Sequence, residues 1–234
     1  QIIIQNAVTK GLDPDAKMKD SGVGCLPAGQ AGIGEIPEGW EVKRLKNVTS
    51  KIGSGITPSG GGTIYLNEGG VPLLRSQNIH FGKLDLSAVA RISEAIHQSM
   101  SNSHVKMGDV LLNITGGSIG RCHFVEIDEP LNVNQHVCII RPNKIDTKYL
   151  NFVLASNIGQ KQIWFFQQGG GREGLNFKAL KNFTIPFPKI QEQTTIVAHI
   201  ENLSAKIDQA ISLQQTQIEK LKEYKASLID SAVT

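Results

Sequence analysis

The sequence predicts an α+β protein in which a mixed α/β domain is followed by a long, coiled-coil-forming α-helix. Three observations lead to this fold class. Apolar residues recur at every third or fourth position throughout the last fifth of the chain. Short strand-like apolar runs, separated by glycine-rich turns, fill the central part. A helical segment interrupts those runs, so the central domain is mixed rather than all-β.

The long helix is the clearest element. Its apolar positions alternate in steps of three and four, which is the spacing of a coiled-coil seam. No proline or glycine follows Pro188, so we expect one helix over 191–231, about 60 Å long. Such a helix needs a partner helix to cover its seam, and Gln214 and Gln217 put polar layers in it that favour one register. The predicted seam comprises Ile200, Leu203, Ile207, Ala210, Gln214, Gln217, Leu221, Tyr224 and Leu228.

The mixed domain is expected over 40–189. Strands are predicted at 40–48, 71–79, 109–114, 121–127, 136–141 and 182–187. A short helix is predicted at 93–99, a longer one at 146–166, and a turn or short helix at 175–180. The glycine-rich stretches 53–62 and 169–174 are expected to be loops.

The two ends of the chain resemble each other. Residues 2–9 read IIIQNAVT and residues 227–234 read SLIDSAVT. This repeat predicts a tandem architecture, in which 1–9 is the end of a preceding long helix and 190–234 is the next one. Residues 10–39 are rich in Gly, Pro and Asp and are predicted to be a linker.

The bulk composition is that of a globular protein of the cytoplasm. Hydrophobic residues make up 40% and charged residues 19%, and no apolar run approaches the roughly 20 residues that cross a bilayer. Cys25, Cys122 and Cys138 lack the spacing of a zinc site, so we expect free, mostly buried thiols. The formal charge is +3; residues 190–234 carry four lysines and six acids, so the rest of the chain carries +5.

Motifs of common enzymes are missing from the sequence. The stretch 108–120, GDVLLNITGGSIG, lacks the Lys-Ser/Thr of a Walker loop and precedes a strand-like run, so we interpret it as a β-hairpin. An Asn/Asp-Pro-Pro-aromatic methyltransferase motif is absent as well. Glu41 and Lys43, with Asp20 as a distant partner, are the one nuclease-like combination, and a solvated strand face explains the pair more simply. The six histidines show no metal-ligand spacing.

Several loops carry side chains suited to reading DNA. Arg pairs with guanine edges and Asn or Gln with adenine edges, which makes 75–78 (RSQN) and Arg172 candidates. Lysines that could neutralise phosphates are Lys51, Lys83, Lys161, Lys178 and Lys181. Ordinary polar loops remain the alternative, and Asn134-Gln135 in particular suits hydrogen bonding within a turn.

Several sequence motifs, in their order along the chain, resemble those of the specificity subunit of Type I restriction–modification enzymes. The blocks that carry the resemblance are IPEGWEVKRLKNV (36–48), GSGITPSGG (53–61), VPLLRSQNI (71–79), GDVLLNITGGSIGRC (108–122), NVNQHVCIIRP (132–142), GGGREGLNFKALKNFTIPFPKIQEQTTIVAHI (169–200) and LKEYKASLIDSAVT (221–234). Such a subunit has two target-recognition domains separated by two long antiparallel helices, and this chain looks like half of one. The stretch 24–32 departs from the usual short connector and looks like an insertion.

The resemblance implies a non-catalytic DNA reader that needs no cofactor or metal. One domain would read half of a bipartite site, and the helix would set the spacing and dock methyltransferase subunits, through which restriction subunits join. A second copy, or the second half of the subunit, would pair through the helix. The candidate DNA contacts are Arg75, Gln77, Asn78, Lys161, Arg172 and Lys178. The alternative is an assembly module that uses the long helix without reading bases; a single-chain nuclease is a third, weaker hypothesis.

Overall fold

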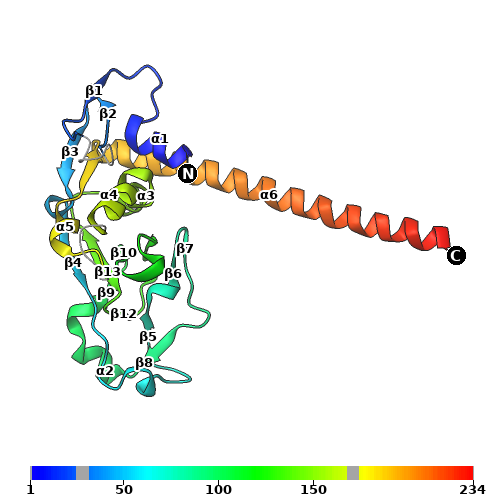
Figure 1. The fold of residues 1–234 in the computed structure, drawn as a ribbon, viewed down its shortest axis with the longest axis horizontal. Helices are drawn as coiled ribbons and strands as arrows, with labels where there is room; N and C mark the ends of the chain where they lie inside the picture. Colours follow the sequence, from blue (N-terminus) through cyan, green and yellow to red (C-terminus); the bar gives the residue numbers. More distant parts are fainter. Residues whose placement is uncertain (1, 25–31, 168–173, 234) are drawn as a thin grey trace. The chain divides into compact units, whose positions relative to one another are not determined.

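The computed structural model describes residues 2–24, 32–167 and 174–233. The chain divides into two compact units, Gln1–Ile196 and Val197–Thr234. The first unit holds all the strands. The second is the distal part of one helix, α6 (Ile190–Val233), whose first turns belong to the first unit. Figure 1 shows α6 as a single uninterrupted helix, which confirms the helix predicted over 191–231.

Two four-stranded sheets form the centre of the first unit. In one sheet the order is β11 (Cys122–Phe124), β10 (Val110–Asn113), β13 (Val137–Pro142) and β4 (Thr49–Ser54), with antiparallel neighbours throughout. In the other the order is β8 (Ala90–Ile92), β5 (Val71–Leu74), β12 (Leu131–Val133) and β9 (His104–Val105), and here β5 and β12 run parallel. Apolar side chains of both sheets meet in one core cluster, including Leu74, Val105, Leu111, Leu131, Val133, Val137 and Ile139.

Three antiparallel strand pairs complete the β structure of the described residues. They are β1 (Met18–Asp20) with β2 (Glu35–Pro37), β3 (Glu41–Arg44) with β14 (Thr184–Phe187), and β6 (Ile79–His80) with β7 (Lys83–Leu84). The stretch 10–39, which its composition predicts to be a linker, therefore contains a small sheet. That sheet also buries Ile36, which is 1% exposed, so part of this stretch belongs to the folded unit.

The shorter helices among the described residues are α1 (Ile2–Lys10), α2 (Glu94–Ser99), α3 (Thr147–Ala155), α4 (Asn157–Gln167) and α5 (Phe177–Lys181). Side chains cap the starts of α2, α3 and α5. Ser93 Oγ accepts the amide hydrogen of Ile96, and the Asp146 carboxylate accepts that of Tyr149. Each cap satisfies one of the amides that a helix start leaves without an internal partner.

The helix predicted over 146–166 is two helices. Ser156 separates them with extended backbone angles. Its hydroxyl donates to the carbonyl of Val153 in α3 and accepts the amide of Ile158 in α4. A serine that bonds to the backbone on both sides competes with the helical ladder, which explains the break.

Several predicted boundaries were also wrong. The strand expected over 40–48 ends at Arg44, and the loop expected over 53–62 begins inside β4, a strand that was not predicted. The strand expected over 71–79 ends at Leu74, and a 3₁₀ turn, Ser76–Asn78, follows it. The strand expected over 136–141 corresponds to β13, whereas β12, which lies just before it, was not predicted. By contrast, β10 and β11 pair antiparallel, which confirms the hairpin interpretation of the glycine-rich stretch 108–120.

The first turn of α6 is fixed to the mixed domain by buried polar contacts. Gln193 is fully buried; its Oε1 accepts the amide of Asp146 at 2.8 Å, and its Nε2 donates to the carbonyl of Pro188 at 2.8 Å. The indole Nε1 of Trp40 donates to Glu192 Oε1 at 2.9 Å. Buried amide groups that are fully paired specify one geometry, so these contacts determine how the helix starts.

No helix among the described residues combines the length and apolarity that a bilayer crossing requires.

Candidate nucleic-acid interface

The predicted contact segment 75–78 forms a tight turn at the end of β5. Asn78, at its close, is 3% exposed, and its Oδ1 accepts the amide of Arg75 at 2.9 Å. Its Nδ2 donates to the carbonyl of Asp85 at 2.9 Å. Because both ends of the Asn78 amide are used to hold the turn and the base of the β6–β7 hairpin, we do not retain Asn78 as a base-reading residue. Gln77, one position earlier, is exposed.

Arg75 is half-buried beside this turn. Its guanidinium carbon lies 5.6 Å from the centre of the Tyr65 ring, so the planar group is held against an aromatic face. The Nε atom is buried and has no hydrogen-bond partner within the described part of the chain. A buried N–H group without an acceptor is unfavourable. If the Arg75 guanidinium turned outward, an acceptor atom of a ligand could form the missing hydrogen bond and remove this cost.

Two further loops join this turn in one polar cluster. Asn113 Nδ2 donates to the carbonyl of Ser76 at 2.8 Å and to Ser118 Oγ at 3.1 Å. Thr115 Oγ1 lies 2.7 Å from His136 Nδ1. We call residues 75–78, 115–118 and 134–136 the loop cluster. It places amide, hydroxyl, imidazole and guanidinium groups from distant parts of the sequence next to one another.

Asn134 has the structural role that the sequence suggests for it. It is buried, and its Oδ1 accepts the amide of His136 at 3.1 Å, which is a turn stabilised by its own side chain. Gln135 beside it is exposed, and its Nε2 lies 3.0 Å from His136 Nε2.

The remaining predicted contacts lie in different places. Lys161 is exposed on α4, next to Gln160, whose Nε2 donates to the carbonyl of Gly120 at 3.0 Å beside the β10–β11 turn. Lys178 is exposed on α5, which packs against β4 and is not part of the loop cluster. Arg172 lies outside the described residues.

A basic surface that was not predicted from the sequence runs over β3, β4 and α5. Two neighbouring hollows, of about 640 and 530 Å³, share Lys46 as a lining residue. Of the residues that the structure describes, none that lines either hollow carries a carboxylate. We call the six cations that line them the basic strip: Lys43, Arg44, Lys46, Lys51, Lys144 and Lys181. A concave surface lined by one sign of charge concentrates counter-charged ligands.

Half of the strip cations are restrained by neighbours. Lys43 Nζ lies 3.1 Å from Glu41 Oε2 and 4.3 Å from the centre of the Phe187 ring. Arg44 Nη1 donates to Asn182 Oδ1 at 3.4 Å. Lys51 Nζ donates to the carbonyl of Asn102 at 2.6 Å; burial first, and then the positive charge of Arg141, lower the pKa of this amine.

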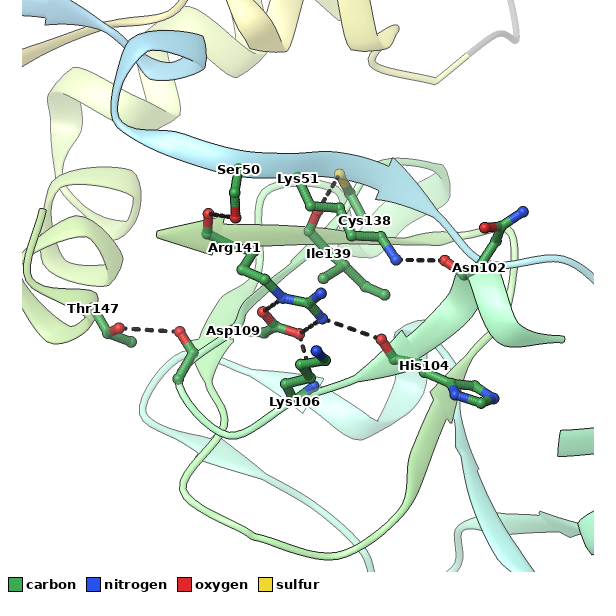
Figure 2. Close-up of polar contacts among 11 residues, drawn as sticks. Ser50, Lys51, Asn102, His104, Lys106, Asp109, Cys138, Ile139, Arg141 and Thr147 are labelled. Carbon is green, nitrogen blue, oxygen red and sulfur yellow. Dashed lines mark hydrogen bonds and ion pairs between the residues drawn. The ribbon is translucent and has the colours of Figure 1, made fainter. Parts of the chain in front are cut away.

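Next to Lys51 of the strip, Arg141 forms an ion pair with the buried carboxylate of Asp109 (Figure 2). The Asp109 carboxylate is 1% exposed and accepts two hydrogen bonds from Arg141, from Nε at 2.7 Å and from Nη2 at 2.8 Å. It also accepts the amide of Lys106 at 2.8 Å, and Arg141 Nη2 donates to the carbonyl of His104 at 3.3 Å. The hydrogen bonding of the Arg141 guanidinium to the Asp109 carboxylate, which accepts, is the main cause of the raised pKa of Arg141, so the guanidinium stays charged. The pair joins β13 to the turn before β10.

Candidate catalytic groups do not assemble among the described residues. Lys43 and Glu41 form an exposed ion pair on β3, and no group of three or more His, Cys, Asp or Glu side chains in that part of the chain could hold a metal. Burial raises the pKa of Cys122 and Cys138 to about 12, so both are unreactive thiols at neutral pH. Cys25 lies outside the described residues.

The predicted seam of α6 is mostly uncovered. Ile200 is buried and Leu203 half-buried. Further along, Ile207, Leu221, Tyr224 and Leu228 are between 46% and 67% exposed. A row of large apolar side chains at heptad spacing is typical of a helix that pairs with another.

The family of the chain follows from its similarity to known proteins. Residues 37–223 match the Type I restriction modification DNA specificity domain. The chain belongs to this family. It is 29% identical over 210 residues to the Type I restriction enzyme MjaVIII specificity subunit of Methanocaldococcus jannaschii, an alignment that covers 86% of this chain and 47% of that one. It is 32% identical over 180 residues to the EcoBI specificity subunit of Escherichia coli, covering 74% of this chain and 36% of the relative.

Solved structures of specificity subunits share the fold. The HsdS subunit from Thermoanaerobacter tengcongensis superposes with a TM-score of 0.56 at 20% identity, over 88% of this chain and 42% of that one. A chain from a structure of Type I restriction–modification complex assembly gives the same TM-score over 81% of this chain and 44% of its own length. The present chain thus spans less than half the length of these relatives. The family match confirms the expected family, and the likeness to the solved structures confirms the mixed domain followed by a long helix.

Proposed function

We propose that this chain is the DNA-reading component of a Type I restriction–modification system and that it performs no chemistry itself. The observation that carries the proposal is the match of residues 37–223 to the DNA specificity domain of such systems. Methylation, cleavage and translocation would belong to partner subunits, and the chain would act in the cytoplasm, where those partners meet DNA.

We assign a role to each segment. Residues 1–9 are the end of a preceding long helix, 10–39 the linker with its small sheet, 40–189 the target-recognition domain, and 190–234 the long helix. The domain reads one half of a bipartite site. The helix sets the distance to a second reader and docks methyltransferase subunits, through which restriction subunits join.

Within the domain, we assign base reading to the loop cluster. Arg75 and Gln77 have the side-chain geometry to bond to base edges in the major groove, where each bidentate pair discriminates by about 1–3 kcal/mol. Gln77 is exposed, and Arg75 has a buried donor that lacks an acceptor. Lys161, Arg172 and Lys178 remain proposed contacts.

A second DNA-reading domain would join this chain through α6. The exposed seam would pack against the same seam of a second copy or of the second half of a longer subunit. Gln214 and Gln217 would form polar layers that favour one register over its alternatives.

Substitution of Arg75 and Gln77 tests base reading. We expect Arg75→Ala and Gln77→Ala each to lower the preference for one or two positions of the selected DNA site by about 1–3 kcal/mol and to leave the other positions unchanged. The measurement is competition binding with single-base variants of the site, with the methyltransferase subunit present. Gln98→Ala, at an exposed position on α2, is the matched control and should leave every preference unaltered.

Two results would contradict the assignment. If both variants bind all site variants as the unsubstituted chain does, the loop cluster does not read bases. A second result concerns the unsubstituted chain. If that chain shows no base preference, and it and both variants assemble fully with the methyltransferase, the chain is better described as an assembly module that does not read DNA.

A further inference from the structure

We propose that the basic strip binds the phosphate groups of duplex DNA and sets the position of the domain on the duplex without reading sequence. This inference rests on the proposed function. It divides the domain into two parts: the loop cluster supplies base contacts, and the strip supplies the sequence-independent contacts that most protein–DNA complexes make with phosphates.

The composition of the strip is that of a phosphate-binding surface. Its six cations come from four separate stretches of the sequence, around positions 43–46, 51, 144 and 181, and the fold brings them to two adjoining hollows. Among the described residues, the side chains that line the hollows include no carboxylate, and the one carboxylate paired with a strip cation is Glu41, 3.1 Å from Lys43 Nζ. Residues 1–189 carry the net charge of +5, whereas 190–234 carry −2, so the positive potential lies on the folded unit that contains the strip.

The strip combines restrained and free cations. Lys43, Arg44 and Lys51 are restrained by the contacts to Phe187, Asn182 and Asn102 described above. Lys46, Lys144 and Lys181 are exposed, and no ion pair joins them to a carboxylate in the described ranges 2–24, 32–167 and 174–233. Exposed ammonium groups that neutralise phosphates release the cations condensed on the DNA, which is the basis of salt-dependent binding.

The rigidity of the supporting structure favours a positioning role. β4 is the outermost strand of its sheet and pairs with β13, whose Arg141 forms the buried pair with Asp109. The same sheet contains β10, where Asn113 holds the Ser76–Asn78 turn of the loop cluster. Phosphates bound at the strip would therefore be kept at a constant distance from the groups proposed to read bases.

A salt titration with Lys46→Gln plus Lys181→Gln tests the proposal. The probe is a fluorescent duplex of mixed sequence, and binding to the full chain is followed by anisotropy as the KCl concentration is raised. Each phosphate contact contributes about 0.9 to the slope of log affinity against log salt, so we expect the slope to fall by about 1.8. At 0.1 M salt this corresponds to about 60-fold weaker binding. A selected site and an unrelated duplex should lose the same factor.

Lys220→Gln plus Lys225→Gln is the matched control. It removes the same formal charge from exposed positions on α6, and we expect the slope to stay that of the unsubstituted chain. Equal effects of the two double variants would show that only net charge matters and would overturn the proposal.

Other outcomes are equally decisive. An unchanged slope in the strip variant overturns the proposal, even if that variant no longer binds the methyltransferase subunit, in which case the strip is a protein-docking surface. A changed preference among site variants with the slope retained would make the strip a base reader and would also contradict it. A chain whose binding shows the predicted slope change but no sequence preference at all would support the strip and refute the proposed function, so the two failures are distinguishable.

Discussion

Asp109→Ala is expected to lower the free energy of unfolding of the mixed domain by about 3–5 kcal/mol. The carboxylate is 1% exposed and receives both the guanidinium of Arg141 and the amide of Lys106. Removal of the carboxylate deprives two groups of this acceptor: the Arg141 guanidinium, whose side chain is 24% exposed, and the backbone amide of Lys106. Urea denaturation followed by circular dichroism measures the loss, and the midpoint should shift without a large change in slope.

Two further variants make this test specific. Glu41→Ala breaks an exposed ion pair with Lys43, at 3.1 Å, and should cost at most about 1 kcal/mol. Replacing both members of the buried pair, Asp109→Leu with Arg141→Met, should recover much of the lost stability, because an apolar pair needs no hydrogen-bond partners. If Asp109→Ala and Glu41→Ala cost the same, the buried pair does not stabilise the domain as we describe.

The seam of α6 carries the second large effect. We expect the chain to self-associate through this helix, and Ile207→Asp with Leu221→Asp to weaken that association by at least about 1000-fold. A buried Ile or Leu side chain contributes about 1.5–3 kcal/mol, and each substitution acts in both helices of a pair. Analytical ultracentrifugation over a concentration series measures the dissociation constant directly.

The control places the same charges on the opposite side of the helix. Ser212→Asp with Ala226→Asp alters exposed positions that a heptad repeat puts farthest from the seam, and association should remain near that of the unsubstituted chain. A chain that stays monomeric at high micromolar concentration before any substitution would refute self-association through 191–231.

Much of the fold was predictable from the sequence because local signals agree with the final structure. The heptad spacing of α6 persists over its whole length, and Ser93 caps the helix that was predicted to start there. The β10–β11 hairpin has apolar strands on either side of a glycine-rich turn. Such elements are specified by residues that lie close together in the sequence, so they can be predicted from a single sequence.

Polar side chains that form hydrogen bonds inside the fold were the hardest to place from the sequence. β12 was missed because Asn132 lies in it: this side chain is fully buried, and its amide bonds at 3.0 Å to His97, which lies 35 positions earlier. Asn78 has the chemistry of an adenine reader but is used to hold a turn. In both cases residue type suggested an exposed loop, whereas hydrogen bonds, to a distant side chain for Asn132 and to nearby backbone for Asn78, hold the amide in the interior.

The candidate site was also predicted only in part. The run 43–46 contains three cations in four positions, which is a detectable signal of a basic patch. Lys144 and Lys181 join it only through the pairing of β3 with β14 and of β4 with β13. Lys51 and Lys181 were predicted as phosphate contacts one by one, without the surface that unites them.

Selection from a pool of random duplexes tests the central claim most directly. The full chain, assembled with the methyltransferase subunit of its system, would be used to select DNA, and the bound fraction would be sequenced. Our account predicts an enriched bipartite site in which one half loses its preference in the Arg75→Ala variant. A bound fraction with the composition of the starting pool, from a complex shown to be assembled, would contradict it.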